Sequence, residues 1–103
     1  MRKQHQRQLL ALLETIGEAQ DHGLYADCQE GALAMIEFIE RQAGKGTLAV
    51  DLLQEYYHLL FKVHNGEIDK NPLYGQLRRV EASIKTELKP NRYKALFLPY
   101  YDN

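Results

Sequence analysis

The single cysteine and one Glu-x-x-His motif have residue types that could support chemistry. Cys28 could act as a nucleophile if a histidine activated its thiol, but it lies on the apolar face of an expected helix, where a cysteine usually packs as a small hydrophobic side chain. Glu55 and His58 have the spacing found in di-iron bundles, which need a second such motif and two further glutamates. The chain contains no second Glu-x-x-His motif. Both residues are therefore expected on the surface, with no metal bound.

A glycine-rich segment, Gly44-Lys45-Gly46-Thr47, resembles part of a phosphate-binding loop. The full GxxxxGK[ST] spacing and the preceding strand are both missing, so the segment predicts a turn between two helices. The sequence also contains no Ser/His/Asp set, no pair of catalytic carboxylates and no cofactor fingerprint. We therefore expect no catalytic residue, no cofactor and no enzymatic activity.

Length and composition restrict the class of protein. The chain has 103 residues, which suits a single domain. Its net charge of −1 argues against a globally basic nucleic-acid binder. The apolar run near the N-terminus, Leu9–Leu13, is shorter than the roughly seven to fifteen residues of a signal-peptide core. No stretch approaches the roughly 18 apolar residues of a membrane span. The expected location is the cytoplasm.

Four segments with a helical period must position any functional residue. Apolar residues recur at three- and four-residue spacings, which place them on one face of a helix. The expected faces are Leu9, Leu12, Leu13, Ile16 and Ala19; Tyr25, Cys28, Ala32, Met35, Ile36 and Ile39; Leu52, Leu53, Tyr56, Leu60 and Val63, widened by Tyr57 and Phe61; and Leu73, Leu77, Val80, Ile84 and Leu88. The aromatic set Tyr56, Tyr57 and Phe61 is expected to be core.

Short connections separate these segments. Gly23 and Gly66 are expected to end helices, because glycine readily adopts the left-handed conformation after a last turn. Thr47 is expected to cap the third helix, and Asn71 to cap the fourth, with Pro72 at its first position. Short connections make successive helices antiparallel neighbours. The sequence therefore predicts an all-α, antiparallel up-down bundle of three to four helices. In the three-helix alternative, the N-terminal helix is only loosely attached.

The C-terminal residues differ from the rest of the chain. Pro90 should end the fourth helix, so residues 1–90 are expected to form the bundle and residues 91–103 an extended tail. The segment 93–98 is short and rich in apolar and aromatic side chains, as is typical of a strand. We expect this segment to be ordered by contact, either with its own bundle or with a second copy.

Charge is distributed unevenly. Residues 14–67 carry a net charge of −7 and residues 70–94 a net charge of +5. The basic fourth helix either lies beside acidic helices or offers a face to phosphate or an anionic membrane. The residues expected to form an interaction surface are Arg78, Arg79, Lys85, Lys89, Tyr93, Phe97 and Tyr100.

Parts of the sequence resemble a known bacterial family. The segments CQEGALAMIEFIE (28–40), GKGT (44–47) and LLQEYYHLL (52–60) are similar to a helical region that precedes a CDP-glycerol glycerophosphotransferase-like domain in clostridial-type proteins. Residues 96–100 resemble the Phe-Leu-Pro-Tyr that opens the catalytic part. The resemblance covers roughly residues 25–100 and implies an accessory or docking module. It carries over no transferase active-site residue.

Three functions remain open at this point. The first is a non-enzymatic module for protein–protein interaction, with a protein partner or a second copy forming a homodimer. The second is an accessory domain of a cell-envelope polymer transferase system. The third is a weak nucleic-acid or anionic-lipid binder that uses the basic fourth helix. The absence of an aromatic ladder among the basic residues makes nucleic acid the less favoured partner.

Overall fold

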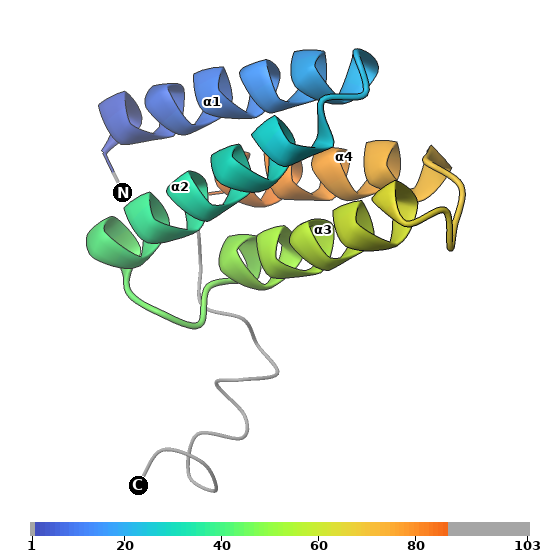
Figure 1. Ribbon diagram of the computed structural model, residues 1–103. Coiled ribbons are helices and arrows are strands. Elements are labelled where there is room, and N and C mark those ends of the chain that lie inside the picture. The colour runs from blue at the N-terminus through green and yellow to red at the C-terminus, as the bar shows by residue number, and fades with distance from the viewer. Residues whose placement is uncertain (1, 87–103) are drawn as a thin grey trace, which may run out of the picture.

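Four helices make up most of the computed structural model, which describes residues 2–86 (Figure 1). Their bounds are α1 (Lys3–Asp21), α2 (Tyr25–Ala43), α3 (Leu48–His64) and α4 (Asn71–Lys85). Helix accounts for 82% of the described residues, which include no strand. The predicted all-α helical bundle is thus confirmed.

Each helix packs against two others, in the order α1, α2, α3, α4 and back to α1. Successive helices run in opposite directions (Figure 1). One end of the bundle therefore holds residue 2, the α2–α3 connection and the last turn of α4. The other end holds the α1–α2 and α3–α4 connections. We call these the amino-terminal end and the opposite end.

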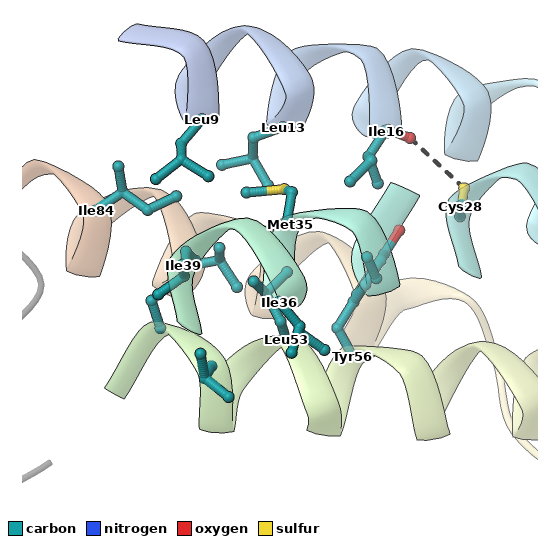
Figure 2. Close-up of a cluster of buried hydrophobic side chains, with 14 of the residues drawn as sticks. Leu9, Leu13, Ile16, Cys28, Met35, Ile36, Ile39, Leu53, Tyr56 and Ile84 are labelled. Carbon is teal, nitrogen blue, oxygen red and sulfur yellow. Dashed lines mark hydrogen bonds between the residues drawn. The ribbon is translucent and has the colours of Figure 1, made fainter. Parts of the chain in front are cut away.

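The core lies between the four helices and takes side chains from all of them. Figure 2 shows Leu9, Leu13 and Ile16 pointing from α1 toward Met35 and Ile39 of α2. These three α1 side chains are 0–6% exposed. Burial of each large aliphatic side chain contributes roughly 1.5–3 kcal/mol. The first helix is therefore an integral part of a four-helix core, which settles the choice between the two predicted bundles.

Local signals explain where the helices begin and end. Gly23 (φ 70°) and Gly44 (φ 81°) adopt the positive φ that favours glycine after α1 and α2. The hydroxyl of Thr47 accepts a hydrogen bond from the Val50 N–H at 3.3 Å, as the sequence predicts for an N-cap. The cap expected at Asn71 is wrong, because Asn71 is already the first residue of α4. Its N–H instead donates to the carboxylate of Asp69 at 2.8 Å.

One glycine allows α1 and α2 to approach closely. A Cβ atom added at Gly31 would lie 2.7 Å from Cγ1 of Ile16. Real Cβ atoms essentially never come so close, so the side chain of Ile16 would have to move. Gly31 thus fixes the packing distance between these two helices, although its position in the sequence gives no sign of this role.

The expected tail over residues 91–103 and the bundle boundary at residue 90 lie outside the described residues. So do four residues of the expected interaction surface, Lys89, Tyr93, Phe97 and Tyr100.

Candidate functional site

A groove of about 550 Å³ runs between α1 and α4. Of the four pairs of neighbouring helices, these two contact each other least. Near the amino-terminal end, the side-chain amide of Gln6 donates to the Ile84 carbonyl at 3.0 Å and joins the two helices. The groove is lined by Arg7, Leu10, Ala11, Leu13, Glu14 and Gly17 of α1 and by Leu77, Arg78, Glu81 and Lys85 of α4.

The lining of this α1/α4 groove is apolar with charges of both signs. Leucine and alanine side chains supply the apolar part, and three basic and two acidic residues supply the charges. Nζ of Lys85 lies 3.9 Å from Oε1 of Glu81, and both side chains are more than half exposed. An exposed pair of this kind contributes little to stability. The groove therefore presents apolar surface together with charges that remain accessible to a partner.

A glycine in the wall of the groove has no packing role within the bundle. Gly17 lies inside α1, where glycine costs about 1 kcal/mol of stability relative to alanine. Apart from the adjacent backbone of α1 itself, a Cβ atom at this position would meet no atom of residues 2–86 within 4 Å. The bundle itself therefore leaves room for alanine at residue 17. Because glycine has no side chain, no atoms project from this position into the groove.

The structure divides the predicted basic surface. Arg78 and Lys85 line the α1/α4 groove, whereas Arg79 lines a second, smaller pocket between α3 and α4. The three basic residues of α4 therefore lie on two sides of the helix rather than in one strip.

A buried polar cluster lies near the opposite end of the bundle. The hydroxyl of Tyr56 donates to Oε1 of Gln20 at 2.7 Å, and the thiol of Cys28 donates to the Ile16 carbonyl at 3.6 Å (Figure 2). Burial raises the pKa of the Cys28 thiol above its ordinary value. Burial also raises the pKa of the Tyr56 phenol. Cys28 is fully buried and held as a thiol, which is the inert state of a cysteine.

The Glu-x-x-His pair lies at the surface. Glu55 and His58 are exposed on α3. Within residues 2–86, no three His, Cys, Asp or Glu side chains are grouped so that they could hold a metal ion. The expected aromatic core set is only partly correct. Tyr56 is fully buried, but Phe61 is 44% exposed and stacks edge to face on Tyr57 at the surface.

The polar residues that join the helices were not predicted from the sequence. Gln76 is buried in α4, where its amide donates to the Leu52 carbonyl at 2.9 Å and ties α4 to α3. Gln6 joins α1 to α4 in the same way, through its amide and the Ile84 carbonyl. Gln20 joins α1 to α3 as an acceptor, because its Oε1 accepts from the Tyr56 hydroxyl. Glutamine is usually exposed. The only signal of these three glutamines in the sequence is that each lies three or four residues from an apolar residue of the buried face of its helix.

Comparison with known proteins adds no relative. No protein-family model matches the sequence, and neither a curated protein nor a solved structure shows significant similarity to it. Among residues 2–86, no helix has both the length and the apolar character needed to cross a membrane.

Proposed function

We propose that this chain is a non-enzymatic, cytoplasmic interaction module that binds an amphipathic segment of a partner protein in the α1/α4 groove. The partner segment would place apolar side chains against Leu10, Ala11 and Leu77. It would carry charges of both signs opposite the mixed charges of the two groove walls. Docking of an amphipathic segment into an apolar groove between helices is a recurring mode of peptide recognition.

The observation that carries this proposal is Gly17. An internal helix glycine reduces stability, and nothing in the bundle requires it at this position. A partner backbone lying close to α1 would require it, because glycine has no side chain to keep another backbone away from the helix. Gly75 of α4 is a matched internal glycine that also has open space around its Cβ position, but it does not line the groove.

Two alanines provide a matched test of the groove. Ala11 and Ala34 are both exposed and helical, but only Ala11 lines the groove. The wild-type protein, Ala11→Arg and Ala34→Arg are immobilised in parallel and used to capture proteins from native cytoplasm. The proposal requires a protein that is captured by the wild type and by Ala34→Arg but not by Ala11→Arg. That protein, once purified, should bind the wild type in a defined stoichiometry. Equal capture by all three would contradict it.

Binding to phosphate through α4 is the less favoured alternative. Arg78 and Arg79 face different pockets, and Glu81 lies beside Lys85. A nucleic acid or an anionic membrane gains affinity from several phosphate contacts made together. Basic residues that lie on two sides of α4 are poorly placed to make such contacts at the same time. Binding to duplex DNA or to anionic vesicles that falls steeply with salt would support this alternative.

The resemblance in sequence supports a second candidate, an accessory domain that acts with a cell-envelope polymer transferase. The α1/α4 groove would then receive a segment of the transferase. Co-expression of the chain with a CDP-glycerol-type transferase from the same genome tests this candidate. Co-purification that Ala11→Arg abolishes and Ala34→Arg preserves would support it.

A further inference from the structure

An exposed leucine projects from the α1–α2 connection at the opposite end of the bundle. The side chain of Leu24 is 50% exposed. Its backbone is nevertheless fixed on both sides, because its N–H donates to the Ala19 carbonyl at 2.9 Å and its carbonyl accepts from the Cys28 N–H at 3.1 Å. Leu24 is therefore an apolar knob in a defined position.

Two exposed acidic residues flank this knob. Asp27 lies in the first turn of α2, where a negative charge stabilises the helix. Asp21, in contrast, is the last residue of α1, where the helix dipole disfavours an acid, and the last turn of α1 contains no basic residue. The stability of α1 therefore does not explain why an acidic residue occupies position 21. Together the two aspartates give the surface around Leu24 a negative charge.

A pocket of complementary character lies toward the amino-terminal end. It has a volume of about 320 Å³ and is lined by Leu48, Leu52, Arg79, Ala82, Ser83 and Thr86. Leu48 is 44% exposed, so the apolar part of this pocket is open to solvent. Arg79 supplies a positive charge at the apolar surface, whereas Leu24 is flanked by negative charges.

The two halves of the bundle differ in net charge in the same way: the half with the pocket is basic and the half with Leu24 is acidic. The half that contains the pocket (residues 2–12, 34–56 and 78–86) carries eight basic and five acidic residues. The other half (residues 13–33 and 57–77) carries two basic and seven acidic residues. The opposite net charges of the two halves would therefore attract a second copy placed end to end.

We infer that Leu24 of one copy docks in the Leu48/Leu52/Ala82 pocket of a second copy, with Asp21 and Asp27 facing Arg79. Knob and pocket lie at different ends of the bundle (Figure 1), so each chain offers one of each. Such a contact is head-to-tail and extends into chains instead of closing as a symmetric dimer. Its small apolar area makes it a weak contact that forms at high protein concentration and low salt.

Sedimentation equilibrium tests the inference on the full chain. The weight-average mass of the wild type should rise beyond twice the monomer mass of 12.0 kDa at ~1 mM protein in low salt and fall toward it in ~0.5 M salt. Leu24→Glu and Leu48→Glu should each be monomeric. Both place an acid in the first turn of a helix or next to it, so circular dichroism should show intact folds. Leu33→Glu is the matched control, because Leu33 is also 50% exposed and lies in neither surface; it should still associate.

Mixing the two monomeric variants gives the decisive result. A mixture of Leu24→Glu and Leu48→Glu contains one intact knob and one intact pocket, so it should form one-to-one dimers that grow no further. A wild type that stays monomeric at ~1 mM, an association that neither variant removes, or a mixture that stays monomeric would overturn the inference. The α1/α4 groove shares no residue with this contact, so these outcomes leave the proposed function unaffected, and failure of the groove experiment leaves this inference unaffected.

Discussion

The phenolic oxygen of Tyr56 lies 2.7 Å from Oε1 of Gln20, so α3 is hydrogen-bonded through the core to the last turns of α1. Both side chains are buried, at 0% and 3% exposure. Nε2 of Gln20 is also buried and has no hydrogen-bond partner among the described residues. The bond with Tyr56 therefore satisfies only part of the hydrogen-bonding capacity of this buried amide.

Removal of the Tyr56 hydroxyl should be costly because it leaves Gln20 with no partner. We expect Tyr56→Phe to lower the free energy of unfolding by ~1–3 kcal/mol, the cost of an unsatisfied buried polar group. Urea unfolding monitored by circular dichroism measures this change. Tyr57→Phe, at a partly exposed site on the same helix, is the control and should cost less than ~0.5 kcal/mol. Equal losses in both variants would contradict the role of the buried bond.

Stability should fall at alkaline pH. Burial raises the pKa of the Cys28 thiol above its ordinary value of 9.0 and also raises the pKa of the Tyr56 phenol. The unfolded chain therefore loses these protons before the folded chain does. The stabilisation is fully present below pH ~9 and is lost as the pH rises through the folded-state pKa values.

Urea unfolding at a series of pH values from 7 to ~11, with reductant present, measures this dependence. We expect Cys28→Ala to flatten the decline because it removes the group that ionises first. A free energy of unfolding that is constant or rises over this range would contradict the assignment of a buried thiol and phenol.

Glycine substitutions should separate close packing from open space. Gly31→Ala forces Ile16 to move and should destabilise the bundle by ~1–3 kcal/mol. The added methyl groups of Gly17→Ala and Gly75→Ala meet no neighbouring element within 4 Å in the described part of the chain, so each change should stabilise the bundle by ~0.5–1 kcal/mol. Thermal unfolding of the three variants checks the signs. Of the two stabilising changes, only Gly17→Ala should weaken partner binding in the groove.

Truncation of α4 side chains should distinguish the core from the groove. Ile84 is fully buried, so Ile84→Ala should cost ~2–4 kcal/mol through lost burial and a cavity. Leu77 is only partly buried and lines the groove, so Leu77→Ala should cost ~1 kcal/mol, within the range of ordinary substitutions. Equal costs would mean that the groove wall is packed as tightly as the core.

Helical periodicity predicted the elements of this fold, because four apolar faces and their glycine boundaries depend on local sequence. It did not predict the width of each buried face, which depends on how neighbouring helices lie. Leu12 fits the face of α1 by spacing but is 39% exposed, and Phe61 is exposed beside a buried Tyr56. The first turn of α4 differs from the prediction because Asp69 reaches forward to the N–H of Asn71.

The sequence located the candidate site only in part. It indicated Arg78 and Lys85 by their charge, and the structure places both in the α1/α4 groove. Ala11 and Gly17 carry no distinctive signal, since a groove results from two helices that pack loosely along part of their length. Arg79 adjoins Arg78 in the sequence, but the turn of the helix directs it to a different pocket.

Amide hydrogen exchange of the full chain, with and without the purified partner, tests the central claim most directly. If the partner segment lies in the α1/α4 groove, added protection should concentrate on the helix turns that line it, residues 7–17 of α1 and 77–85 of α4. The exposed face of α2 around Leu33 and Ala34 should exchange as in the free protein. Protection confined to α2 and α3, with α1 and α4 unchanged, would contradict the account.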